Sequence, residues 1–189
     1  MDFAEAQRAR DLLAQHGAVE AQQAREWAGT FALPSELEEF YREVGPVNVS
    51  IRGYGNSTFL PRLSALWEHQ VGYRFHGHSG ERLDDWDDDW IVIGDVGADP
   101  YIYSRQSKTV LFARHGEGAW DPEPLYRSPI AMVACVATLG TIAVQAGPDF
   151  TDASGRVRSI YAATGARRLR EYLTRPGEAE ALLSTYGWA

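Results

Sequence analysis

The feature that most constrains this sequence is an apolar run without charged residues at positions 130–147. Its length lies at the lower edge of what a membrane-spanning helix requires. Two threonines, a glycine and a glutamine interrupt the run, which weakens it as a membrane segment. Ser128 and Pro129 stand directly before it, and this pair is typical of a helix N-cap followed by proline in the first turn. We therefore predict a buried helix in the core of a soluble domain.

The length and composition favour one domain built around that helix. The chain has 189 residues, of which 44% are hydrophobic and 12% aromatic, as in globular proteins. We expect a single domain over residues 1–189. Cys135 is the only cysteine, so an intramolecular disulfide or a cysteine-rich zinc site is excluded and packing must hold the fold. The N-terminal residues mix acids with arginines instead of forming an apolar signal, so we expect a cytoplasmic protein.

The residues before position 90 predict helices, a pair of strands and a long connection. Ser35 and Glu38 have the spacing of a capping box, and apolar side chains follow at helical intervals up to Val44. The expected elements are helices at 2–16, 21–28 and 35–44, strands within 47–59, a short helix near 63–67 and a connection at 69–89.

From residue 90 the pattern changes to short strands. Residues 91–93, 101–103 and 109–112 are rich in β-branched and aromatic side chains, and turn residues separate them. This short spacing favours an antiparallel meander, because parallel strands need long crossovers. Residues 155–189 indicate two amphipathic helices, broken at Pro176 and Gly177. We predict an α+β fold: an antiparallel sheet with helices packed on one side, and extra C-terminal helices.

Three motifs occur in order along the middle of the chain: Leu33-Pro34-x-x-Leu37-x-x-Phe40-Tyr41, then Trp90-Ile91-Val92-Ile93-Gly94-Asp95-x-Gly97-x-Asp99-Pro100, then His115-Gly116 with Trp120. This combination resembles the SUKH superfamily over residues 30–140, where the order of the expected elements is also similar. The sequence departs from the family at Val44-Gly45-Pro46, where many relatives carry Asn-Gly. It also has a longer helical tail, residues 151–189, so neither the subfamily nor the toxin follows from the resemblance.

The resemblance implies a function without catalysis. SUKH proteins are α+β domains with no general enzymatic activity, and many bacterial members are immunity proteins that neutralise toxins of polymorphic toxin systems, often nucleases. The expectation is therefore a toxin–antitoxin pair in which this chain binds a cognate toxin, without a cofactor. The alternative is a cytoplasmic regulatory or scaffold module of the cell-wall assembly regulator type. A metal-dependent hydrolase is a third class.

Residues 84–89 form the most unusual stretch of the sequence. Five aspartates with little compensating charge repel one another, so either solvent or a cationic partner must disperse their charge. In one interpretation this is a solvated loop, and Trp90 anchors the strand that follows. In the other, the charge steers a basic toxin and Trp86 becomes the buried anchor of the interface. The candidate partner-binding residues are Asp84, Asp85, Trp86, Asp87, Asp88 and Asp89.

A metal site fits these residues less well. The aspartates alternate as in a calcium loop, but Trp90 stands where the sixth position needs glycine. Val96 stands where the twelfth position needs a bidentate glutamate. His76 and His78 are better explained as polar loop residues than as a ligand pair. We expect no metal, no cofactor and no catalytic residue.

The carboxylates that follow the strand at 91–93 are interpreted as turn residues. Aspartate accepts hydrogen bonds from turn N–H groups, glycine supplies positive φ, and proline fixes the entry to the next strand. The structural turn residues in this interpretation are Gly94, Asp95, Gly97, Asp99 and Pro100.

The negative charge is confined to one part of the chain. Of the formal net charge of −8, residues 151–189 hold +2, from six arginines and four acids, which leaves −10 for residues 1–150. Such a surface repels nucleic acid and anionic lipid and attracts basic proteins. We therefore expect a basic protein partner and no direct contact with nucleic acid or membrane. The arginines of the tail either form solvated helix faces or pair with the aspartates of residues 84–89.

Overall fold

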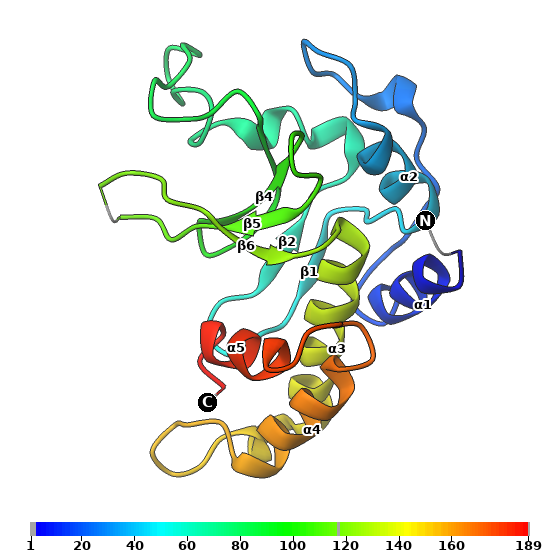
Figure 1. Ribbon diagram of the computed structural model, residues 1–189, viewed down its shortest axis with the longest axis vertical. Coiled ribbons are helices and arrows are strands. Elements are labelled where there is room, and N and C mark those ends of the chain that lie inside the picture. Colours follow the sequence, from blue (N-terminus) through cyan, green and yellow to red (C-terminus); the bar gives the residue numbers. More distant parts are fainter. Residues whose placement is uncertain (1–2, 117, 189) are drawn as a thin grey trace.

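Six strands form one antiparallel meander in the computed structural model, which describes residues 3–116 and 118–188 (Figure 1). Each strand pairs with its neighbours in chain order, so the predicted α+β class and antiparallel sheet are confirmed. The sixth strand was not predicted, because a segment with prolines and acids has no strand pattern. The strands are β1 (Val49–Ile51), β2 (Thr58–Leu60), β3 (Trp90–Val96), β4 (Asp99–Ser104), β5 (Val110–Phe112) and β6 (Glu123–Tyr126).

The helices form close to their predicted positions. The expected segment at 21–28 shortens to a single helical turn, and so does the one near 63–67. The α-helices are α1 (Phe3–Leu13), α2 (Ser35–Glu43), α3 (Pro129–Ala146), α4 (Ser159–Leu169) and α5 (Glu178–Thr185). The 3-10 turns are η1 (Ala24–Glu26), η2 (Leu63–Ala65), η3 (Glu68–Gln70) and η4 (Gly147–Phe150).

The central helix is α3, in which residues 129–143 are all buried. Ser128 Oγ accepts a hydrogen bond from the Ala131 N–H at 3.1 Å, which confirms the predicted N-cap. By length and composition this helix could cross a membrane, yet 78% of its most apolar window is buried inside the protein. It therefore packs as the core helix that the sequence predicts.

A glycine lets α3 lie unusually close to the sheet. A Cβ atom on Gly140 would stand 2.4 Å from Ile51 Cγ2 and 3.0 Å from the backbone oxygen of Arg52. The first distance is too short for a real side chain and the second is tight, so a larger residue would push α3 away from β1. This explains why an otherwise apolar helix contains glycine at its centre.

The two faces of the sheet are covered differently. Helices cover one face, as predicted, and the largest core lies between them and the sheet. Irregular chain covers the opposite face, where a smaller, separate core forms. This second core contains Tyr73, Trp86, Val92, Ile102, Leu111 and Ala113, with Trp90 and Trp120 packed against it. The connection at 69–89 is therefore the cover of a core and not a free loop.

A side chain fastens this connection to the sheet. β2 pairs with β3 only at Asp95 and Val96, which leaves the rest of that edge without a strand. Further along, the Gln70 side-chain amide donates to the Val92 carbonyl at 2.8 Å and accepts the Val92 N–H at 2.9 Å. These two bonds replace a missing strand neighbour, so the buried backbone of β3 is satisfied.

The predicted capping box at the start of α2 is wrong. The N-cap is Pro34, and Ser35 lies inside the first turn, where its Oγ donates to the Glu36 carboxylate at 3.1 Å. The helix starts one residue earlier than the Ser-x-x-Glu pattern implies, because Pro34 already has the extended conformation of an N-cap.

The C-terminal helices belong to the same core. The Tyr186 hydroxyl lies between two other phenols: it hydrogen-bonds Tyr101, and it is 2.6 Å from the Tyr126 hydroxyl. Burial raises the pKa of each phenol well above its usual value, so the chain of hydroxyls stays protonated. Trp188 is 3% exposed and packs on Phe150. Residues 151–188 thus pack as part of the same core.

Candidate functional site

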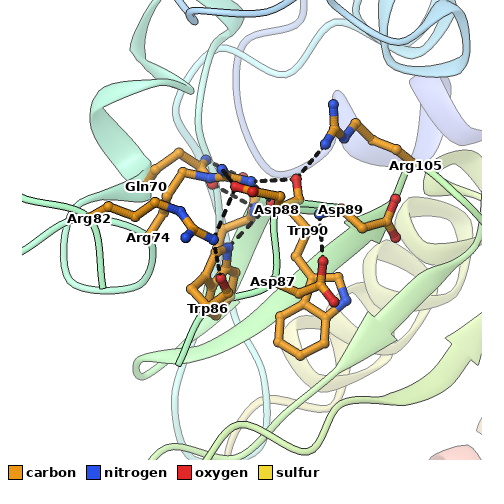
Figure 2. Close-up of polar contacts among 10 residues, drawn as sticks. Gln70, Arg74, Arg82, Trp86, Asp87, Asp88, Asp89, Trp90 and Arg105 are labelled. Carbon is orange, nitrogen blue, oxygen red and sulfur yellow. Dashed lines mark hydrogen bonds and ion pairs between the residues drawn. The ribbon is translucent and has the colours of Figure 1, made fainter. Parts of the chain in front are cut away.

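The acidic loop, residues 84–89, lies between η3 and β3, and Figure 2 shows most of its polar contacts. Backbone hydrogen bonds fix its course. The Leu83 N–H donates to the Arg74 carbonyl at 2.9 Å, just before the loop begins. The Trp90 N–H donates to the Asp87 carbonyl at 3.2 Å, where the loop enters β3. The loop is therefore a series of turns with two fixed ends.

Trp86 points from the loop into the second core. Its side chain is among the largest that are fully buried, with 1% exposure. The indole meets Trp90 and Trp120 edge to face, with ring centroids 5.3 Å and 5.5 Å away, and Nε1 donates to the Trp90 carbonyl. The hypothesis that Trp86 anchors a partner is therefore wrong. The indole is already used to attach the loop to its own sheet.

Arg74 holds the loop from beneath and is 5% exposed. Its guanidinium donates to the Asp88 carboxylate at 3.2 Å, to the Asp88 carbonyl at 2.8 Å and to the Trp90 carbonyl at 2.7 Å. Burial lowers the pKa of Arg74 and the charge of Asp88 opposes that shift. Arginine remains protonated in proteins, so this is a buried cation that requires Asp88 as its counter-ion.

Two more arginines converge on the same aspartate, as Figure 2 shows. Arg82 donates to the Trp86 carbonyl at 2.6 Å and lies 3.0 Å from the Asp88 carboxylate. Arg105, at the end of β4, donates to the Asp88 carbonyl from the other side. The charge of Asp88 is thus compensated by arginines of the same chain, although 72% of its side chain is exposed to solvent. It belongs to the scaffold of the loop.

The remaining carboxylates differ in their partners. Asp89 accepts a hydrogen bond from the Ser104 hydroxyl, and Asp87 accepts one from the Asp89 N–H at 2.8 Å. Asp84 and Asp85 have no hydrogen bond or ion pair with any residue that the structure describes. All of Asp84, Asp85 and Asp87 are exposed, and within the described ranges none forms an ion pair. These three carboxylates are the exposed part of the loop whose charge is not paired within the described residues.

The proposed pairing of the tail arginines with the acidic loop is wrong. Within the described residues, four of the six tail arginines form ion pairs, either inside the tail or with the preceding helical turn η4. The ion pairs are Arg156 with Asp152, Arg158 with Asp149, Arg170 with Glu180 and Arg175 with Glu178. The cations that hold the loop come instead from positions 74, 82 and 105.

A turn follows β3, but only Gly97 of the five predicted turn residues lies in it. Only Gly97 and Ala98 form it, with φ of 61° and 76°, as a two-residue hairpin of the primed kind requires. Asp95 ends β3 and Asp99 begins β4, and Pro100 follows within that strand. Gly94 is not a turn residue: it lies within β3, where a Cβ atom would be 2.5 Å from the Phe59 carbonyl oxygen.

Two histidines to which the sequence assigned no structural role brace this hairpin. The His115 N–H and ring Nδ1 both contact the Asp99 carboxylate. His69 Nε2 lies 3.1 Å from Asp95 Oδ2, close enough for attraction but not aligned as a hydrogen bond. These contacts explain the aspartates as structural residues.

The histidine pair upstream of the loop is exposed. The rings of His76 and His78 are 6.0 Å apart, and the His78 N–H contacts His76 Nδ1. Among residues 3–116 and 118–188, no group of three or more histidine, cysteine or acidic side chains is arranged to hold a metal ion.

Comparisons of this chain with family models, with curated proteins and with solved structures return no match. The resemblance to the SUKH superfamily therefore remains a prediction from motifs. The geometry divides the six predicted loop residues. Trp86 and Asp88 hold the loop in place, and Asp89 connects it to Ser104 in β4.

Proposed function

We propose that this chain is an immunity protein of the SUKH type, which neutralises a basic cognate toxin by binding to it in the cytoplasm. One observation carries the proposal. Asp84, Asp85 and Asp87 face solvent without a cation among the described residues, on a loop that Trp86 and Arg74 hold in place. A partner with a basic surface supplies the missing positive charges.

The fixed loop favours such binding in two ways. Three like charges at set positions create a negative potential that attracts a basic surface at long range and raises the association rate. Because the loop is already ordered, little conformational entropy is lost when the partner docks. The internal clamp and the free carboxylates thus have complementary roles.

A nuclease toxin fits this chemistry well. Its active site must be basic in order to hold phosphate groups. Carboxylates at fixed positions occupy such a site in place of the nucleic acid, so the toxin is blocked without any reaction by this chain. In this proposal the chain has no catalytic residue and needs no cofactor.

Co-expression with candidate toxin domains, followed by co-purification and a toxicity assay, tests the proposal. We expect one basic domain to co-purify and to lose its activity, with an association rate that falls about tenfold or more as salt is raised. Asp87→Asn should slow association severalfold, because it removes a free charge. Glu171→Gln removes the same charge between α4 and α5 and should have no effect.

Two results would contradict the proposal. One is binding that depends on neither salt nor Asp87, and the other is turnover of a substrate by the purified chain. Recovery of a cellular regulator in place of a toxin would favour the scaffold-module alternative.

A further inference from the structure

Four partly exposed aromatic rings lie next to the acidic loop and come from three separate segments. We call Trp27, Phe31, Trp67 and Phe75 the aromatic cluster. Trp67 is at its centre: its ring centroid is 5.4 Å from Trp27, 5.5 Å from Phe31 and 5.2 Å from Phe75, each contact close to edge-on. Such contacts fix the orientation of rings that solvent still reaches.

The arginines that clamp the acidic loop also touch this cluster. Arg105 Cζ lies 4.6 Å from the centroid of the Phe31 ring, and Arg74 Cζ lies 5.6 Å from the same ring. Both guanidinium groups hydrogen-bond the Asp88 carbonyl. The same two side chains, Arg74 and Arg105, therefore contact both the aromatic cluster and the acidic loop.

An aliphatic side chain extends the cluster. Val71 is 47% exposed, and its backbone bridges to that of Phe75. Exposed apolar groups that gather beside a polar rim are typical of protein interfaces, whereas single ones are common on any surface. Val71 thus adds an exposed apolar side chain to a residue whose backbone is bridged to Phe75, one of the four aromatic residues.

The charges around this apolar centre favour a basic partner. Glu26 and Glu68 flank the aromatic cluster on its own segments. With the five aspartates of the acidic loop they make seven carboxylates, which outnumber the neighbouring arginines by two; these arginines are Arg25, Arg62, Arg74, Arg82 and Arg105. An aromatic centre with a net negative rim is complementary to an apolar side chain flanked by lysine or arginine.

We infer that the aromatic cluster, with Val71, is the apolar anchor of the interface with a basic protein partner. An apolar side chain of the partner packs on Trp67 and Val71, while its flanking cations meet the free carboxylates of the acidic loop. The inference rests on the proposed function and supplies the anchor that the buried Trp86 cannot be. Tryptophan is enriched among the residues that dominate binding energy, which fits Trp67 in this position.

A titration that needs no toxin tests the inference. The chain is labelled with fluorotryptophan, its fluorine NMR signals are assigned with single Trp→Phe variants, and two capped tetrapeptides are added: Arg-Leu-Leu-Arg and Arg-Gly-Gly-Arg. We expect the leucine peptide to shift the Trp27 and Trp67 signals saturably, and the glycine peptide to have at least about tenfold weaker effect. The signal of Trp188, buried in the C-terminal part of the core, should not move.

A matched pair of variants completes the test. Val71→Arg places a cation beside the aromatic cluster without disturbing a buried residue. It should weaken binding of the leucine peptide about tenfold or more. Ile160→Arg makes the same change at a 66% exposed site in α4 and should leave the titration unchanged. Equal responses to both peptides, or equal behaviour of both variants, would overturn the inference. Since no toxin is used, either result leaves the co-purification test of the proposed function standing.

Discussion

The two faces of the sheet are built in different ways. The helix-covered face is an apolar core in which α3 contributes an unbroken buried stretch. The loop-covered face has a small core centred on Trp86, and its cover is fastened by the polar side chains of Gln70 and Arg74. Apolar burial thus holds the helices on one face of the sheet, whereas a few buried polar side chains hold the irregular cover on the other face. Substitutions on the two sides should therefore have different consequences.

The largest effect is expected for Trp86→Ala. Removal of a buried indole lowers the free energy of unfolding by about 3–5 kcal/mol, because it leaves a cavity as well as lost burial. The damage should stay on the loop side. Urea denaturation measures the loss, and hydrogen exchange should show the amides of residues 71–90 exposed while those of α3 remain protected.

Phe40→Ala provides the comparison from the helix-covered face. Its ring is fully buried in the large core, so the loss of stability should be of similar size. In this variant the α3 amides should exchange faster. If Trp86→Ala loosens α3 equally, the two faces act as one cooperative unit and the comparison drawn above does not hold.

An intermediate effect is expected for Arg74→Leu. The substitution removes hydrogen bonds to two backbone carbonyls, those of Asp88 and Trp90, and leaves the acidic loop without its main cation, at a cost of about 2 kcal/mol. Arg25→Leu removes an exposed arginine and should cost less than about 0.5 kcal/mol. Equal midpoints for the two variants in urea would show that the buried guanidinium does not hold the loop.

The smallest effect is expected at Glu36, where α2 meets the turn between β4 and β5. The Lys108 ammonium, 2.6 Å away, lowers the pKa of this carboxyl from 4.5 to about 2. Because the folded-state pKa is depressed, the ion pair stabilises the fold above pH 4.5, and this contribution is lost as the pH falls towards 2. The side chain is partly exposed, so the gain is below about 1 kcal/mol.

Glu36→Gln tests this sign directly. Near neutral pH the variant should unfold at slightly lower urea than the wild type, and the two curves should converge as the pH approaches 2. A difference that grows in acid would contradict the assignment.

The fold could be predicted from the sequence where periodicity is strong. The uncharged run before Gly147 and the β-branched strands of the meander leave few alternatives. β6 was not predicted, because Pro124 and Glu123 are unusual in strands, although an edge strand tolerates them. The start of α2 was misplaced because a capping pattern is local, whereas Pro34 set the boundary.

The site was predicted only in outline. The aspartates were found because a run of like charge is visible in the sequence, but their division into scaffold and free carboxylates depends on tertiary contacts. Arg74 and Arg82 stand within 14 residues of Asp88, so nearby compensating charge was a usable signal. Arg105 directly follows the next strand, β4, and only the β3–β4 pairing brings it to the loop. The burial of Trp86 left no signal that separates it from an exposed indole.

The division of the acidic loop also affects how such a protein can evolve. Asp84 and Asp85 form no hydrogen bond or ion pair within the described chain, so mutations there carry little penalty for folding. A substitution of Asp88 should be less well tolerated, because its carboxylate compensates the buried cation of Arg74. Under the proposed function, recognition can therefore diversify at Asp84 and Asp85 while the residues that hold the loop stay unchanged, which suits a lineage that must follow a changing antagonist.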